Sequence, residues 1–157
     1  MVGVNVRIER LAPMRVASVW CFSETPRQDA WSNLSAWAES RGMRVDLDRH
    51  PVFGFNKPSP SPIGGKYGYE LWIGVDQDTE SEGEIVVKDF SGGLYAVTAC
   101  RLHPDPARTM DEVWRRLWDW VEASGYELRS THGLEKARNP RPFEDEFWLD
   151  LYLPIEE

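Results

Sequence analysis

The feature that most constrains the fold is an internal repeat at an offset of about eighty residues. The pattern W-x-x-L-x-x-W-x-x-x-x-G runs from Trp31 to Gly42 and again from Trp114 to Gly125. Two further pairs of segments match in the same order, namely 15–21 with 94–100 and 70–75 with 150–155. Two copies are too few for a solenoid, so we expect them to pair into one pseudo-two-fold domain, with a ligand site at their seam.

Each copy predicts the same order of elements. Alternating or extended runs predict strands at 4–9, 15–22, 51–56 and 67–75 in the first copy, and at 84–88, 94–102, 134–137 and 147–153 in the second. Between the second and third strand of each copy, capping boxes at Thr25 and Thr109 begin helices that Gly42 and Gly125 end. The sequence therefore predicts an α+β fold with an antiparallel sheet and two helices on one face. We expect a single domain over 1–157, built of repeats at about 3–76 and 83–156.

Composition and charge exclude several classes of protein. The chain is 157 residues long and 41% apolar, with no apolar run near the ~20 residues that span a bilayer and no basic-then-apolar leader. We therefore expect a cytoplasmic protein that does not bind membranes. The net charge of −8 argues against a protein that binds nucleic acid, since such a protein needs a basic face.

Cys21 and Cys100 occupy equivalent positions and are expected to be buried thiols without a disulfide.

Few of the usual catalytic or metal-binding patterns occur. His50, His103 and His132 lie far apart in the sequence without metal-ligand spacing, so we expect no metal. Ser91-Gly92-Gly93 has no lysine or helix start behind it and is therefore no phosphate loop. No serine or cysteine has a neighbouring histidine that would serve as its base. We expect no cofactor.

Two acids stand among aromatic residues on predicted strands. Glu70 lies in Y-G-Y-E-L-W at 67–72, and Asp150 lies in F-W-L-D-L-Y at 147–152. Side chains two apart on a strand share a face, and Gly68 would open space for a ligand beside Trp72. A carboxylate walled by aromatic faces binds planar cations, and burial there would raise its pKa and make it a general acid. The alternative is a half-buried strand with aromatic residues in the core and acids in solvent.

The helix tryptophans are expected to differ in role. Trp31 and Trp37 with Leu34, and Trp120 with Leu117, have the spacing of a helix face that packs on a sheet. Trp118 stands at the edge of its stripe. It is the helix residue that we expect to face a cavity.

Three motifs, in order along the chain, match the pattern of a known family. They are V-R-I-E-R-L-A-P-M-R-V-A at 6–17, F-G-F-N-x-P at 53–58 followed by Y-G-Y-E-x-W at 67–72, and the ending D-L-Y-L-P-I at 150–155. With the doubled element order, the chain resembles the GyrI-like small-molecule-binding domain, which is also the effector domain of multidrug-responsive transcription regulators. The resemblance covers essentially the whole chain and implies a bacterial effector-binding protein.

The resemblance implies a pocket at the junction of the two copies, lined by aromatic residues around a buried glutamate. Glu135, in the short stretch L-E-K-A at 134–137, stands at the position of that glutamate. Trp72 and Tyr152 match pocket aromatics by position. The predicted ligand-binding residues are Trp72, Tyr152, Trp148, Asp150, Trp118, Phe55 and Tyr67, and the candidate catalytic residues are Glu135 and Glu70.

Two functions follow as hypotheses. In the first, the chain is a stand-alone protein, monomer or homodimer, that captures planar hydrophobic or cationic compounds, multidrug ligands among them. In the alternative, it resembles family members that hydrolyse electrophilic xenobiotics by opening strained cyclopropane rings, with Glu135 or Glu70 as general acid or base. A protein partner such as gyrase is a third possibility that the resemblance brings.

Overall fold

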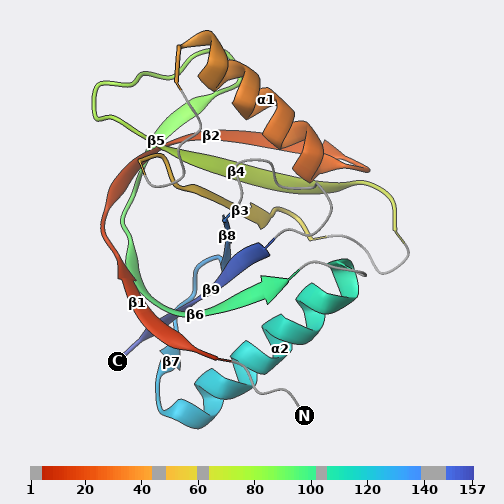
Figure 1. The fold of residues 1–157 in the computed structure, drawn as a ribbon, viewed down its shortest axis with the longest axis vertical. Coiled ribbons are helices and arrows are strands. Elements are labelled where there is room, and N and C mark those ends of the chain that lie inside the picture. Colours follow the sequence, from red (N-terminus) through yellow and green to blue (C-terminus); the bar gives the residue numbers. More distant parts are fainter. Residues whose placement is uncertain (1–4, 44–48, 60–63, 102–105, 139–147) are drawn as a thin grey trace. The chain divides into compact units, whose positions relative to one another are not determined.

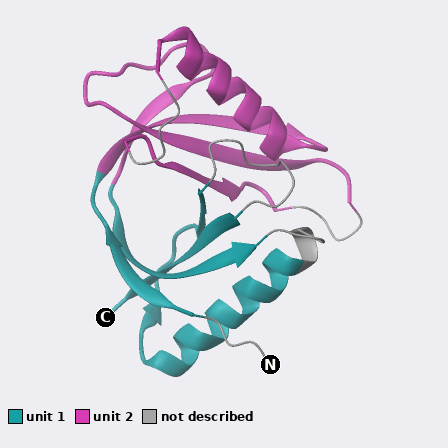
Figure 2. Ribbon diagram, viewed as in Figure 1, with its two compact units in different colours: residues 1–13, 91–157 teal, residues 14–90 magenta. Residues whose placement is uncertain are grey.

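The computed structural model describes residues 5–43, 49–59, 64–101, 106–138 and 148–157. These residues form two compact units, shown in different colours in Figure 2. We call residues 14–90 the middle unit, and residues 1–13 with 91–157 the terminal unit. Val4, Leu102 and Phe147, at the ends of predicted strands, and His103 lie outside the described residues.

The middle unit is a four-stranded antiparallel arrangement with one helix. Its elements are β2 (Met14–Ser23), α1 (Pro26–Ser40), β3 (Val52–Asn56), β4 (Tyr67–Val75) and β5 (Val86–Phe90). The strands lie in the order β3-β4-β2-β5. The helix α1 packs on β2 and β4 (Figure 1) and buries Ala30, Leu34 and Trp37. This apolar stripe is the face that the helical spacing predicted.

The terminal unit has the same plan. Its elements are β1 (Arg7–Leu11), β6 (Gly93–Arg101), α2 (Pro106–Ser124), β7 (Glu127–Leu128), β8 (Leu134–Ala137) and β9 (Trp148–Glu156). The strands lie in the order β8-β9-β6-β1, and the short β7 pairs with the end of β9. The helix α2 packs on β6, with Leu117 and Val121 buried. The predicted α+β fold, antiparallel with two helices, is confirmed.

The first strands of the two repeats are exchanged. β1 opens the first repeat in sequence, yet it pairs with β6 of the second, from Arg7 opposite Val97 to Leu11 opposite Gly93. β5 opens the second repeat and pairs with β2 of the first. Each compact unit therefore has one edge strand that belongs to the other sequence repeat. For this reason the boundaries of the units differ from the boundaries of the repeats. The assignment of 1–157 as a single domain stays a prediction.

Both helix starts differ from the predicted capping boxes. α1 begins at Pro26 as expected, but no side chain caps it; Ser23 Oγ instead donates to Asp29 Oδ2 at 2.5 Å. α2 begins at Pro106, three residues before Thr109, so the second capping box is wrong. Proline fits the first turn of a helix because its φ is already helical and its missing N–H has no partner there. None of the helices in the described ranges has the length and apolar character needed to cross a membrane.

Candidate ligand-binding site

A buried carboxylate lies at the centre of a polar cluster in the middle unit. Glu70 in β4 is only 3% exposed. Its Oε2 accepts hydrogen bonds from Ser18 Oγ at 2.9 Å, Trp72 Nε1 at 2.5 Å and Lys88 Nζ at 2.5 Å. Its Oε1 accepts a bond from Lys57 Nζ at 3.2 Å. Both carboxylate oxygens therefore have partners within the unit, and two of the four donors are positively charged.

Strand register brings these side chains to one face of the sheet. Ser18 in β2 is opposite Trp72 in β4, and Phe55 in β3 is opposite Glu70, so all four project to the same side. Lys88 reaches this side from β5, where it is opposite Val16 of β2. The helix α1 covers the other face of β2 and β4. The cluster therefore belongs to the face of the middle unit that its own helix leaves uncovered.

Lys88, Trp72 and Ser18 keep Glu70 ionised. Burial by itself raises the pKa of this carboxyl, but the hydrogen bonds from Lys88, Trp72 and Ser18, with the charge of Lys88, outweigh it and lower the pKa to about 2. The raised pKa that the aromatic setting suggested is therefore wrong for Glu70. Glu70 is a carboxylate at neutral pH and has no proton to give as a general acid.

Aromatic rings form a wall beside the carboxylate. The Trp72 ring contacts Phe55 edge-on, with centroids 5.2 Å apart, and Phe90, also at 5.2 Å. Phe90 in turn lies 6.5 Å from Phe53. Phe53 and Phe55 are buried, whereas Trp72 and Phe90 are half-buried and keep part of their rings accessible. Lys88 Nζ lies 5.6 Å from the Trp72 ring centroid, within cation–π range.

The sequence suggested that Gly68 opens a space for a ligand, but the structure shows that this space is filled. A Cβ there would overlap the carbonyl oxygen of Lys57 and lie 2.8 Å from Trp20 Nε1, so the place is already filled. The glycine instead lets the Lys57 backbone approach, and the Trp20 indole donates to that same carbonyl at 2.7 Å. Trp20 stacks on Phe22 at 6.0 Å, and both rings are about half exposed. Tyr67 is half-buried at the first position of β4.

The terminal unit repeats the arrangement with other residue types. Asp150 in β9 stands where Glu70 stands in the first repeat and is also buried, at 6% exposure. Arg138 Nε lies 2.9 Å from its Oδ1, as an ion pair without hydrogen-bond geometry, and Arg7 Nη2 donates to its Oδ2 at 3.5 Å. Arg138 follows β8 as Lys57 follows β3. A buried carboxylate with two cations therefore occurs in both units.

The predicted aromatic residues of β9 differ in exposure. Tyr152 is fully buried, meets Tyr95 edge-on at 5.7 Å, and donates its hydroxyl to Glu9 Oε1 at 3.1 Å. Burial and the neighbouring charge of Glu9 raise the pKa of the Tyr152 phenol. Trp148 is 40% exposed, with the Arg138 guanidinium 5.8 Å from its ring centroid.

The structure does not bring Glu135 together with Asp150. Glu135 in β8 is opposite Leu151, and Asp150 is opposite Lys136, so Glu135 and Asp150 project to opposite faces of the sheet. Glu135 is buried, at 5% exposure. Trp118 is 45% exposed on α2, and its indole N–H donates to Glu122 at 3.0 Å. The roles of Glu135 and Trp118, and the pocket at the junction of the repeats, stay predictions.

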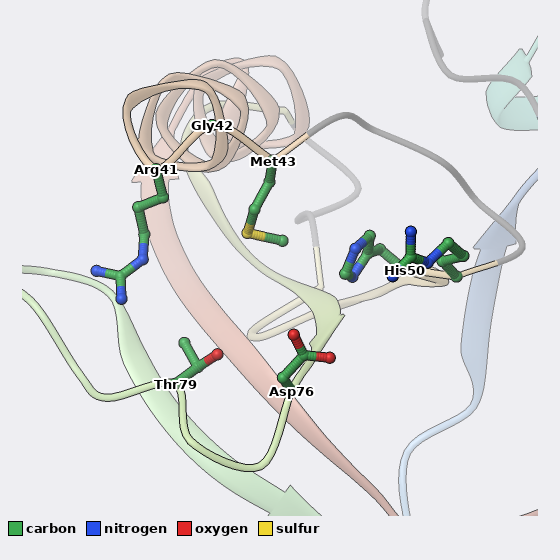
Figure 3. Close-up of a pocket in the computed structure, with 7 residues that line it drawn as sticks. Arg41, Gly42, Met43, His50, Asp76 and Thr79 are labelled. Carbon is green, nitrogen blue, oxygen red and sulfur yellow. The ribbon is translucent and has the colours of Figure 1, made fainter.

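A second feature of the middle unit was not predicted. A cavity of about 490 Å³ opens beside the end of α1 (Figure 3), lined by Arg41, Gly42, Met43, Arg49, His50, Asp76 and Thr79. His50 Nδ1 donates to the Gly74 carbonyl at 2.8 Å, which orients the ring. Arg41 pairs with Glu82 at 2.7 Å. The lining comes from two loops about thirty residues apart, without a motif in either, so the sequence offered no signal for it.

The sequence also matches a known family over nearly its whole length. Residues 7–155 fit the family Cass2, described as integron-associated effector binding protein. The chain belongs to this family. Its fold is that of a GyrI-like domain, as the sequence motifs indicated. No curated protein matches the sequence.

Solved structures share the fold at low sequence identity. The chain in the EcmrR–DNA complex is 14% identical with a TM-score of 0.75, and the match covers 98% of the present chain but only 57% of the EcmrR chain. A hydrolase encoded by lin2189 from Listeria innocua is 12% identical with a TM-score of 0.72 over 98% and 93% of the two chains. SAV2435, solved with tetraphenylphosphonium, is 12% identical with a TM-score of 0.55 over 97% and 94%. At these identities the likeness shows the fold.

Proposed function

We propose that this chain is a small-molecule-binding protein that captures planar hydrophobic compounds at the Glu70 cluster. One observation carries the proposal: Trp72 and Phe90 present half-buried rings beside a buried, fully hydrogen-bonded carboxylate. Apolar and aromatic side chains with a few fixed polar groups are the usual lining of a ligand site. Membership of an effector-binding family and the tetraphenylphosphonium bound by SAV2435 support binding of small molecules in general.

The Trp72→Ala variant tests this proposal. It removes the ring that connects Phe55 with Phe90, so we expect affinity for a planar neutral compound such as 2-naphthalenemethanol to fall about tenfold or more, as the ~1–3 kcal/mol of one aromatic stacking contact implies. Equilibrium dialysis measures the binding. Trp31→Ala is the control, because it removes a half-buried tryptophan of α1 outside the Glu70 cluster. Equal losses in both variants, or none in either, would contradict the assignment of the ligand to Trp72.

The hydrolase hypothesis keeps Glu135 as a candidate general acid or base and Glu70 as a candidate base. Glu70 is disfavoured as a general acid by its low pKa, whereas Glu135 is a buried carboxylate on β8, and one relative of the same fold is named a hydrolase. Mass spectrometry of an electrophilic cyclopropane compound, incubated with wild type and with Glu135→Gln, tests this function. Addition of one water by wild type but not by the variant would favour hydrolysis, and an unchanged compound in both would reject it.

A further inference from the structure

The Glu70 cluster carries a positive charge, although its centre is a carboxylate. One carboxylate and the ammonium groups of Lys57 and Lys88 add to +1. Glu70 accepts one hydrogen bond from each ammonium, which has three N–H groups to donate. The cluster therefore has no uncompensated negative charge to offer a ligand. A cationic compound would have to displace a lysine before it could pair with Glu70.

Burial decides which of these charges a ligand meets. The Glu70 side chain is 4% exposed, whereas the side chains of Lys57 and Lys88 are 55% and 42% exposed. A molecule that approaches from solvent therefore meets the two ammonium groups first. The carboxylate beneath them holds both nitrogens in place through bonds of 3.2 Å and 2.5 Å, which reduces the side-chain entropy that two lysines would otherwise lose on binding an anion.

An aromatic ring lies beside the exposed ammonium groups. Lys88 Nζ is 5.6 Å from the centroid of Trp72, whose ring is half-buried against Phe90. A planar compound with an anionic group on its ring could place the ring on this apolar surface and the anion against the lysines. Carboxylates and sulfonates accept the short charge-assisted hydrogen bonds that ammonium groups give.

The terminal unit shows the same order of burial. Asp150 is 8% exposed at its side chain, while Arg138 and Arg7, which pair with it, are 44% and 48% exposed. In both units a buried acid lies beneath more exposed cations. The net charge differs, because Arg7 also pairs with Glu9 at 3.1 Å.

We infer that Glu70 acts as a positioning residue that holds Lys57 and Lys88 as an anion-binding pair, and that the ligand class of this site is planar aromatic anions, such as aromatic carboxylates. The inference rests on the proposed function, because it names the charge of the compound that the aromatic surface holds.

Three compounds with one ring system test the inference. They are 2-naphthoate, 2-naphthalenemethanol and 2-naphthylmethylammonium, titrated calorimetrically into wild type at pH 7 and low salt. We expect 2-naphthoate to bind about tenfold more tightly than the alcohol, because charge-assisted bonds to partly exposed ammonium groups are worth about one order of magnitude in affinity. The ammonium compound should bind most weakly.

Substitutions test whether the lysines cause the preference for 2-naphthoate over the alcohol. Lys88→Met should lower the affinity for 2-naphthoate about five- to tenfold more than the affinity for the alcohol, while Lys88→Arg, which keeps the charge, should retain the preference. Lys57→Met is the second variant should Lys88→Met fail to fold, and Lys66→Met is the control because Lys66 is an exposed lysine outside the cluster. Circular dichroism verifies folding of each variant.

The outcomes separate the inference from the proposed function. Equal affinity for all three compounds, or tightest binding of the ammonium compound, would overturn the anion-binding pair and leave a planar-ligand site. An equal loss of 2-naphthoate binding in Lys66→Met would also overturn it. Binding of none of the three compounds would overturn both.

Discussion

Replacing Glu70 by glutamine removes the charge that joins Lys57 and Lys88 to the sheet, and its cost can be worked out from the structure. The pKa falls from an ordinary 4.5 to about 2 on folding. At ~1.4 kcal/mol per pKa unit this shift corresponds to about 3 kcal/mol of stability at neutral pH. Because both lysines are partly exposed, water screens them, and we expect Glu70→Gln to lose about 2 kcal/mol.

The pH dependence of the stability difference tests the role of Glu70 more specifically than the size of the difference at neutral pH. A carboxyl whose pKa is lowered by folding stabilises the protein fully above its unfolded pKa of 4.5 and loses that contribution as the pH falls through about 2. Urea unfolding, followed by circular dichroism between pH 7 and pH 2.5, measures the free energy of unfolding. The difference between wild type and Glu70→Gln should be constant from pH 7 to about pH 5 and shrink steadily below it.

Glu82→Gln is the matched control. Glu82 also pairs with a cation, Arg41 at 2.7 Å, but its side chain is 61% exposed, so its loss should cost less than about 1 kcal/mol. The reasoning is refuted by a Glu70→Gln variant as stable as wild type at pH 7. It is equally refuted by a difference that persists unchanged at pH 2.5.

Further substitutions probe the packing around the two clusters. Gly68→Ala would drive a methyl group into the Lys57 carbonyl oxygen, and we expect a loss of about 2 kcal/mol or more in thermal unfolding; an unchanged midpoint would contradict the close approach. Tyr152→Phe loses the bond to Glu9 Oε1 and should cost about 0.5–1.5 kcal/mol, while spectrophotometric titration should show one high-pKa tyrosine fewer than in wild type. Trp118→Ala, at an exposed helix position, should change stability by less than about 0.5 kcal/mol, and a larger change would mean that the ring packs on the protein.

The parts of the fold that depend on local periodicity could be predicted from the sequence. The sequence pattern correctly predicted the buried helix stripe of Leu34 and Trp37 and the positive-φ glycines that follow both helices. It also predicted the positions of the strands β3, β4 and β8. The start of α2 could not be placed, because a proline at 106 and a threonine at 109 are both acceptable first residues. β7 is two residues long and shows no periodicity.

The candidate site could be predicted only in part. Spacing of two residues placed Glu70 and Trp72 on one face, and the bond between them confirms it. Lys57 and Lys88 were missed, because one follows β3 in a loop and the other reaches Glu70 only through the pairing of β5 with β2. No local pattern reports which strands are neighbours. The two lysines also determine the net charge of the cluster. The sequence could therefore indicate Glu70 as a site residue, but it could not indicate that the cluster is positively charged.

The exchanged edge strands bear on how such a chain could have arisen. A single ancestral repeat has no partner within itself for its opening strand, since β1 pairs with β6 and β5 pairs with β2. It could pair its opening strand only as one of two identical chains that exchanged these strands. Joining the two genes end to end would have turned that symmetric pair into one polypeptide. Each half was then free to change by itself, as the lysines around Glu70 and the arginines around Asp150 record.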